Sequence, residues 1–211
     1  MSLIKKNIKI ATILPYKENY THSKASAASL WVAEFFKKSK YSKTNHIYGH
    51  TENKDYLTNN YFNIELTNIK TKLKSATREY INKLVKKFKT QKYDIIEVHN
   101  RPIILDELSK KIKSRYIMYF HNDPLSMNGS KTINQRLNII SSVEKIIFVS
   151  EWVQKRFFVD LDDKLKTKTE VVYPSVTIKK RLSKKKNFIT FIGKLNRSKG
   201  YDLFAKVIVK I

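Results

Sequence analysis

YDIIEVH, at residues 93–99, has the composition of a strand that is buried on both faces of a sheet. Its apolar residues are nearly continuous, whereas a strand with one face in water alternates apolar and polar residues. Asn100-Arg101-Pro102 follows, and proline is favourable in the first turn of a helix because its missing N–H has no partner there. The segment therefore predicts a parallel strand that leads directly into a helix.

Further strands and helices alternate on both sides of this unit. Runs of β-branched and aromatic residues predict strands at 9–14, 45–49, 61–66, 115–120, 145–149 and 170–173. Apolar residues at helical spacing predict helices around 25–36, 81–88, 104–112 and 151–159. Strands that alternate with helices through short connections form a doubly wound parallel sheet with right-handed crossovers. We therefore expect an α/β, Rossmann-like fold.

Polar residues directly follow several of the expected strands. In a doubly wound sheet, ligands lie beyond the carboxyl ends of the strands. The candidate ligand contacts on this rim are His99, Asn100, Arg101, His121, Asn122, Asp123, Ser150 and Glu151. The loop after the first strand has no glycine and adds His22 and Ser23 as candidates. An alternative role for His121 is to cap the end of its strand and bond to Asp123.

A second strand, loop and helix are expected in NFITFIGKLNRSKGY, at residues 187–201. Residues 188–192 have the composition of a buried strand, Gly193 ends it, and apolar residues from Phe204 onward have helical spacing. The loop between them is basic, and a helix N-terminus flanked by cations is where diphosphates bind. Its cations are Lys194, Arg197 and Lys199. The alternative is an ordinary turn that carries surface lysines.

The composition limits the class of protein. With 211 residues, 41% of them hydrophobic, the chain can bury a sizeable core. It has no cysteine, which excludes disulfides and thiolate metal sites, and no apolar run approaches the ~20 residues of a membrane span. The formal net charge of +25 has three open explanations, namely a nucleic-acid partner, an anionic membrane surface, or a lysine-rich composition without a partner.

Signatures of hydrolytic enzymes are missing from the sequence. It contains no serine elbow, Cys–His pair or His-Glu-x-x-His, hence no candidate nucleophile or zinc site. Residues 160–163, DLDD, have the D-x-D spacing that can hold Mn²⁺ or Mg²⁺ on a diphosphate. They follow the helix expected at 151–159, so we expect them on the side of the sheet opposite the rim. The expectation is therefore that no metal takes part.

Five separated segments resemble one known family. In chain order they are DIIEVHNRP, YFHNDP, KIIFVSEWV, VVYPSV and FIGKLNRSKG. Together they resemble the retaining GT-B glycosyltransferases of family four over nearly the whole chain. The resemblance implies an acceptor-side Rossmann-like domain at 1–176, a basic linker at 177–186 and the beginning of a donor-binding domain at 187–211. Because the chain ends at Ile211, we expect this second domain to be truncated and the 211-residue form to be inactive alone.

The resemblance also implies roles for particular residues. His121 matches a histidine that lies in the cleft near the transferred sugar, which makes it the candidate catalytic residue. Lys199 matches the lysine that grips the donor diphosphate, and Lys194 stands where arginine is usual. Gly193 and Arg197 belong to the same expected diphosphate loop.

The implied function is that of a hexosyltransferase-type enzyme that uses a nucleotide-sugar donor. Its acceptor would be a glycan or a lipid-linked molecule, in polysaccharide or lipopolysaccharide synthesis for the cell envelope. The nucleotide-sugar would be a co-substrate, without cofactor or metal. The expected location is the cytoplasm, with peripheral contact at the inner face of an anionic cell membrane and without a specific nucleic acid. The alternative function is a non-catalytic basic module that binds nucleic acid or an anionic membrane surface.

Overall fold

The computed structural model describes residues 8–67, 75–175, 187–193, 195 and 197–209. Contacts divide the chain into two compact units, Met1–Val176 (unit 1) and Thr177–Ile211 (unit 2). The basic linker expected at 177–186 lies outside the described residues.

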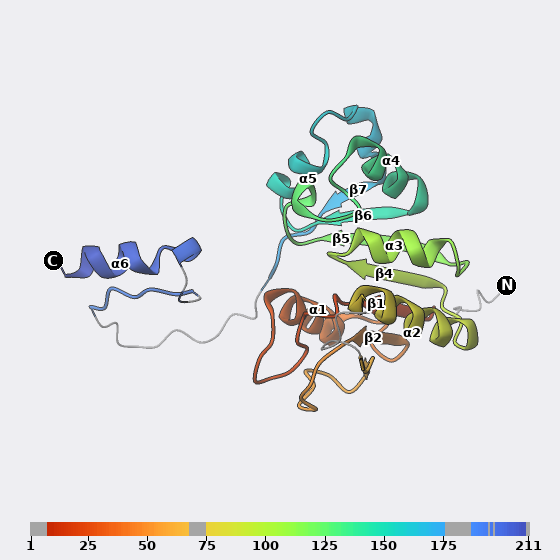
Figure 1. The fold of residues 1–211 in the computed structure, drawn as a ribbon, viewed down its shortest axis with the longest axis horizontal. Helices are drawn as coiled ribbons and strands as arrows, with labels where there is room; N and C mark the ends of the chain where they lie inside the picture. Colours follow the sequence, from red (N-terminus) through yellow and green to blue (C-terminus); the bar gives the residue numbers. More distant parts are fainter. Residues whose placement is uncertain (1–7, 68–74, 176–186, 194, 196, 210–211) are drawn as a thin grey trace. The chain divides into compact units, whose positions relative to one another are not determined.

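Unit 1 is built on a sheet of seven parallel strands in the order β3-β2-β1-β4-β5-β6-β7 (Figure 1). The strands are β1 Ile10–Ile13, β2 Asn45–Gly49, β3 Tyr61–Asn63, β4 Ile95–His99, β5 Arg115–Phe120, β6 Lys145–Phe148 and β7 Thr169–Val171. The expected α/β fold with a doubly wound, Rossmann-like parallel sheet is confirmed.

The order of the strands reverses between β1 and β4, which are neighbours in the sheet. The chain moves outward from β1 to β3 and then returns to β4, from which it moves outward to β7. Right-handed crossovers in opposite directions place helices on both faces of the sheet. The helices of unit 1 are α1 Ala27–Lys38, α2 Ala76–Thr90, α3 Pro102–Ser109, α4 Ile133–Ser142 and α5 Glu151–Phe157.

Two hydrophobic clusters show which helices share a face. Ile47 of β2 packs in a cluster with Trp31 of α1, whereas its neighbour Tyr48 packs in a larger cluster with Leu84 of α2. Residues from α3, α4 and α5 also belong to this larger cluster. Since successive residues of a strand point to opposite faces, α1 covers one face and the other four helices contribute to the second.

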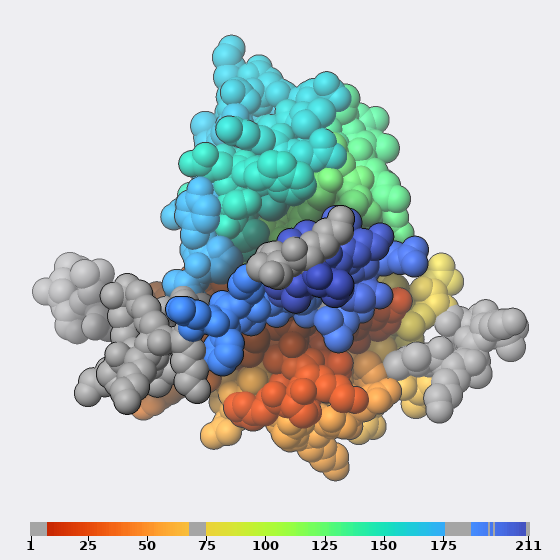
Figure 2. Space-filling view, turned by 90° about the vertical axis from the view of Figure 1, so that its left-hand side faces the viewer, coloured from red at the N-terminus to blue at the C-terminus, as the bar shows by residue number. Residues whose placement is uncertain are grey.

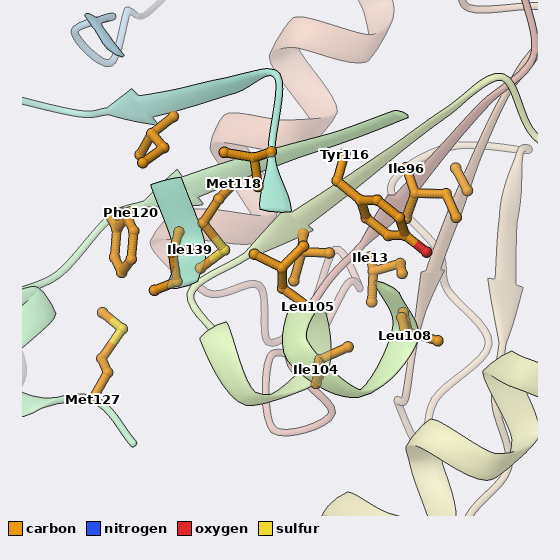
Figure 3. Packing of buried hydrophobic residues seen from close by; sticks show 14 of the residues in the cluster. Ile13, Ile96, Ile104, Leu105, Leu108, Tyr116, Met118, Phe120, Met127 and Ile139 are labelled. Atoms are coloured by element: carbon orange, nitrogen blue, oxygen red, sulfur yellow. The ribbon is translucent and has the colours of Figure 1, made fainter. Parts of the chain in front are cut away.

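Helix α3 shows how the core beside the rim is packed. Its buried residues Ile104, Leu105 and Leu108 point toward the sheet, where Tyr116 and Met118 of β5 meet them (Figure 3). The residues coloured green to cyan lie together in the upper part of the space-filling view (Figure 2), and buried core residues of β5, β6 and α5 belong to one hydrophobic cluster. The rim therefore stands on a rigid base.

Helix α4 was not predicted from the sequence. Two of its apolar side chains, Ile133 and Leu137, are exposed, whereas Arg136 is buried. This arrangement hides the amphipathic pattern on which the prediction of helices depends. Thr132 nevertheless forms a capping box with Gln135, which is a sequence signal for the start of a helix.

Unit 2 contains helix α6, Tyr201–Ile208, as expected, but the strand expected at 188–192 is wrong. Residues 187–193 form no strand, and Phe188 and Ile192 are 75% and 92% exposed. A strand needs hydrogen-bonding neighbours, and the described residues of this unit contain no second strand. Apolar composition alone therefore does not make this segment a strand.

Candidate functional site

The rim of unit 1 brings together the residues that follow β4 and β5. His99 is the last residue of β4, and His121 directly follows β5. Because β4 pairs with β5 in parallel register, with His99 beside Tyr119, the two histidines end up on the same edge of the sheet. The sequence placed both on this rim but did not predict that they touch.

The two histidines form a hydrogen-bonded pair. Nδ1 of His99 lies 2.8 Å from Nε2 of His121, so one ring donates its N–H to the bare nitrogen of the other. The ring of Tyr119 stacks on His99 at 4.3 Å, and the ring of Trp31 meets His121 edge-on at 5.1 Å. Nε2 of His99 is buried and makes no hydrogen bond within the described part of the chain. The expected alternative, a bond from His121 to Asp123, is wrong: within the described residues, the ring of His121 bonds to His99, and the carboxylate of Asp123 bonds to Arg156 and to the N–H of Leu125.

Burial keeps this histidine pair uncharged. It lowers the pKa of His121 to about 4. Burial, and secondarily the neighbouring His121, also holds the pKa of His99 well below its ordinary value. At neutral pH both rings are therefore neutral, and a neutral imidazole can donate one hydrogen bond and accept another.

Asn100 fixes the backbone beside the histidine pair. It has a left-handed backbone with φ of 52°, which asparagine tolerates better than most residues. Its side-chain Oδ1 accepts a hydrogen bond of 2.7 Å from the backbone N–H of His121. Asn100 is buried, so among the predicted rim residues it holds the site together and presents little surface to a ligand.

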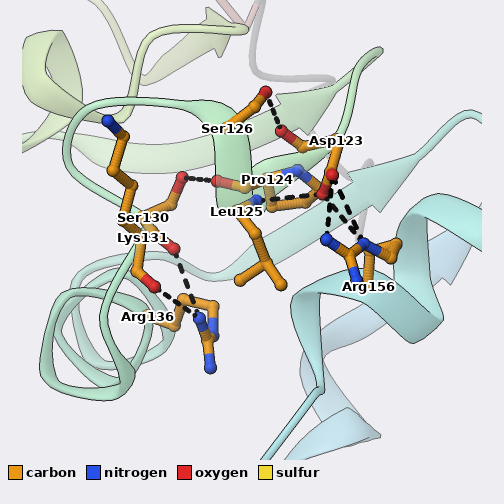
Figure 4. Close-up of polar contacts among 8 residues, drawn as sticks. All are labelled: Asp123, Pro124, Leu125, Ser126, Ser130, Lys131, Arg136 and Arg156. Carbon is orange, nitrogen blue, oxygen red and sulfur yellow. Dashed lines mark hydrogen bonds and ion pairs between the residues drawn. The ribbon is translucent and has the colours of Figure 1, made fainter.

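Asp123 is committed to an ion pair with Arg156 of α5 (Figure 4). Nε of Arg156 lies 3.2 Å from Oδ1, and Nη2 lies 3.1 Å from Oδ2. Hydrogen bonding from Arg156 is the main cause that lowers the pKa of Asp123. Oδ1 also accepts from the N–H of Leu125, at the start of the short 3-10 helix η1, Pro124–Ser126. Asp123 therefore positions the segment after β5, and a contact with sugar stays a prediction.

We expect the pair between Asp123 and Arg156 to contribute about 1 kcal/mol to stability, because a two-point bond between guanidinium and carboxylate is stronger than an exposed single contact. A double-mutant cycle with Asp123→Asn and Arg156→Gln, followed by urea unfolding, measures this coupling. The exposed pair of Asp106 and Lys110 is the matched control. Its side chains are 52% and 62% exposed, against 27% and 38% for Asp123 and Arg156. Equal coupling energies in the two cycles would contradict the expectation.

The other predicted rim residues have simpler environments. Ser150 caps α5, accepting a hydrogen bond of 3.3 Å from the N–H of Val153, and Glu151 is exposed in the first turn. His22 and Ser23 are exposed in the loop before α1. The N–H of Ser23 bonds to the carboxylate of Asp55 at 2.9 Å, which ties this loop to the segment before β3. Contacts of these four residues with a ligand stay predictions.

A cleft of about 860 Å³ opens on the same rim, between α2 and α3. The loop after β1 and the segment after β5 complete its walls. It is lined by Tyr16, Lys17, Ser75, Thr77, Arg78, Ile81, Asn82, Arg101, Ile103, Glu107, Lys111, Asn122, Ser126, Met127 and Asn128. Arg101 and Asn122 were predicted as ligand contacts, and Asn122 directly follows His121. The cleft and the histidine pair therefore share one edge of the sheet.

The sequence missed the remaining polar residues of the cleft. Lys17 follows β1, and Arg78 and Asn82 lie on α2, so their contribution depends on how α2 packs beside α3. Gly129 allows the segment after β5 to approach α3 closely. It has φ of +93°, and a Cβ there would lie 2.9 Å from the backbone nitrogen of Ile103. This glycine, two residues after Met127, is the sequence signal for that close approach.

Comparisons with solved structures match the fold of this chain. HepE from Anabaena in complex with UDP-glucose matches with a TM-score of 0.52 and 14% identity, over 80% of this chain and 44% of HepE. The complex of HepE with UDP matches with a TM-score of 0.51 and 13% identity, over 80% and 44% of the two chains. Sucrose-phosphate synthase from Thermosynechococcus elongatus matches with a TM-score of 0.50 and 10% identity, over 79% and 48%.

The chain has the fold of GT-B glycosyltransferase structures. It spans less than half of the length of the structures it matches. No known protein family model matches the sequence, and no curated protein matches it either. At these identities the likeness establishes the fold alone.

The basic loop of unit 2 is described in part. Lys194 lies outside the described residues, whereas Arg197 and Lys199 are exposed in the 3-10 helix η3, Arg197–Lys199. Gly200 follows with a left-handed backbone of φ 73° and stands at the N-terminus of α6. Two cations and Gly193 therefore lie just before a helix N-terminus, as the diphosphate prediction requires, and ligand binding there stays a prediction.

The described residues contain no cluster of three or more histidine or acidic side chains suited to a metal ion. Asp160 follows α5, which begins at the rim, and Asp162 caps the 3-10 helix η2, Asp163–Lys168. Within the described ranges, no helix is both long enough and apolar enough to cross a membrane.

Proposed function

We propose that this chain takes part in the transfer of a sugar from a nucleotide-sugar to an acceptor, with unit 1 supplying the acceptor side. The observation that carries the proposal is the cleft at the carboxyl edge of a GT-B-like sheet, the same edge that carries a neutral histidine pair. Ligands of such sheets lie at this edge, next to the point where the strand order reverses. That a matching structure, HepE, holds UDP-glucose supports a nucleotide-sugar as the donor.

The acceptor in this proposal is a glycan or a lipid-linked molecule used in cell-envelope polysaccharide synthesis. Asn122 lines the cleft, whereas the ring of His121 packs against Trp31 of α1, on the other face of the sheet. In this proposal the transferred sugar reaches over the rim from the cleft, where the neutral imidazole of His121 can orient a hydroxyl by a hydrogen bond without adding charge. The hexosyltransferase type, retention of configuration and peripheral contact with the membrane belong to the same proposal and rest on the family resemblance.

The donor side of the proposal assigns the leaving diphosphate to unit 2. Sugar transfer develops negative charge on the departing diphosphate, and fixed cations at a helix N-terminus stabilise that charge. Arg197 and Lys199, with Lys194, would balance this charge at the start of α6. The proposal therefore uses lysine, arginine and the helix dipole in place of a metal ion.

In a form of the protein with a complete donor-binding domain, we expect Lys199→Ala to weaken the binding of UDP by about tenfold, because it removes a charge-assisted contact with the diphosphate. Lys24→Ala is the matched control, since Lys24 is an exposed lysine in the loop before α1. Both variants remove one positive charge, so a general effect of net charge is the same in each. Isothermal titration of each variant with UDP and with UDP-glucose measures the dissociation constants, and equal weakening would contradict the assignment.

The same titration tests the proposed function as a whole. The wild-type chain is titrated with UDP, GDP, ADP, dTDP and CMP and with their common sugar conjugates, up to about 1 mM, which detects binding energies beyond ~4 kcal/mol. Thermal unfolding provides a second readout, because a ligand that binds only the folded state raises its stability. Saturable binding of one of these nucleotides by this chain supports the proposed function, and absence of nucleotide binding by a form with a complete donor-binding domain would reject it.

A further inference from the structure

The cleft between α2 and α3 carries an excess of positive charge. Its charged residues are Lys17, Arg78, Arg101 and Lys111 against the single carboxylate of Glu107. Glu107 is already paired with Lys111, whose Nζ lies 2.8 Å from Oε2. Among the described residues that line the cleft, the pairing of Glu107 with Lys111 leaves three cations without a counter-charge.

These three cations have no acidic partner in the part of the chain that the structure describes. None of Lys17, Arg78 and Arg101 forms an ion pair within the described residues. The recorded hydrogen bond of the Arg101 guanidinium is a long one, 3.4 Å, to the carbonyl of Asn100. Arg78 is also among the charges that lower the pKa of Glu107, after the dominant contact with Lys111.

Backbone N–H groups at the start of a helix also favour the binding of an anion in the cleft. The first residues of α2 and α3 line it, and neither helix has a side chain that caps its N-terminus. By contrast, side chains of Ser26, Thr132 and Ser150 cap α1, α4 and α5. The first-turn N–H groups of α2 are available to an anion, and the helix dipole has its positive end there. Helix α3 adds less, because Pro102 has no N–H and the N–H of Ile104 bonds to the carbonyl of Arg101.

We propose that the cleft binds a phosphate group carried by the acceptor, held by Lys17, Arg78 and Arg101. Arginine matches a phosphate with two parallel hydrogen bonds, and lysine adds a point charge. The amides of Asn82, Asn122 and Asn128 suit the hydroxyls of an attached sugar. A volume of about 860 Å³ accommodates such a phosphorylated molecule. That the phosphate belongs to an acceptor rests on the proposed function, whereas the phosphate site itself rests on the residues of the cleft.

The test compares two double variants that remove the same charge. Lys17→Gln with Arg78→Gln changes the cleft, and Lys86→Gln with Lys89→Gln changes exposed lysines of α2 outside it. The net charge of +25 attracts any anion, and the matched pair cancels this general effect. Inorganic phosphate is titrated into each full chain near physiological salt, and amide NMR shifts locate the bound ion. Thermal unfolding confirms that both variants are folded.

We expect the cleft variant to bind phosphate at least about tenfold more weakly than the wild-type chain, and the control variant to stay within about twofold of it. In the wild-type chain we also expect phosphate to shift the amide NMR signals of residues 75–82 and 101–107. Absence of saturable phosphate binding, shifts confined to other segments, or equal weakening in the two double variants would overturn the proposal.

Two further probes identify the source of the phosphate. Glucose 6-phosphate represents a soluble acceptor, and vesicles of phosphatidylglycerol, compared with vesicles of phosphatidylcholine, represent a lipid-linked one. Binding of either probe that is lost in the cleft variant alone supports the proposal, and equal behaviour of the two double variants toward both probes overturns it. Phosphate binding in the cleft without nucleotide binding would keep this site and reject the transferase. Nucleotide binding without phosphate in the cleft would reject the site alone.

Discussion

Replacement of Phe148 by alanine is expected to lower the free energy of unfolding by about 3–5 kcal/mol, the usual cost of truncating a buried phenylalanine. Phe148 is fully buried in β6. Its ring packs against those of Phe120 at 5.7 Å and Phe157 at 5.4 Å. Truncation leaves a cavity between a strand, its neighbour and α5, and a close-packed core relaxes only partly around such a space.

The measurement is urea unfolding of the wild-type and variant chains, followed by circular dichroism. Tyr173→Ala is the control, because Tyr173 follows β7 in unit 1 and is 58% exposed. We expect that substitution to change stability by less than about 0.5 kcal/mol. A loss for Phe148→Ala no larger than that of the control would show that this core is not packed as described.

Acid is expected to destabilise unit 1 as the pH falls from about 6.5 to about 4. The pKa of His121 is about 4 in the folded chain, against an ordinary value of 6.5. A lowered histidine pKa means that the unfolded chain binds protons more readily, so full stability is present above pH 6.5 and is lost as the pH falls. One pKa unit corresponds to ~1.4 kcal/mol, so a shift from 6.5 to about 4 makes the contribution of His121 about 3.5 kcal/mol. The lowered pKa of His99 acts in the same direction.

Urea unfolding at a series of pH values measures this loss. His121→Gln removes one of the titrating rings and is expected to flatten the dependence over this range of pH. The exposed His22→Gln is the control and should leave the wild-type dependence unchanged. A curve for His121→Gln that is as steep as that of the wild-type chain would show that the pair is not the origin of the acid sensitivity. The same histidine pair is the part of the proposed site that must stay neutral. Its burial therefore links the acid sensitivity of the fold to the neutral state of the proposed site.

Most of the fold could be predicted because its signals are local. The strand at 93–99 and its helix appear as a run of apolar residues and a well-placed proline, which need no knowledge of the rest of the chain. The alternation of such pairs then implied a parallel sheet and placed His99 and His121 on its rim. Helix α4 was not predicted, because its Arg136 is buried while its Ile133 is exposed. This reverses the burial that the local sequence pattern predicts for the two residue types.

The amino-acid sequence by itself determined the class of sheet, the edge on which ligands are expected and the polar residues at that edge. The hydrogen bond between His99 and His121, and the cleft that joins Lys17, Arg78 and Arg101, were decided only by tertiary structure. The reason is physical: periodicity and composition act over a few residues, whereas these contacts join segments that are distant along the chain and meet only when strands pair and helices pack. For the same reason residues 188–192, apolar but without a neighbouring strand in the described part of unit 2, do not form the strand that their composition suggests.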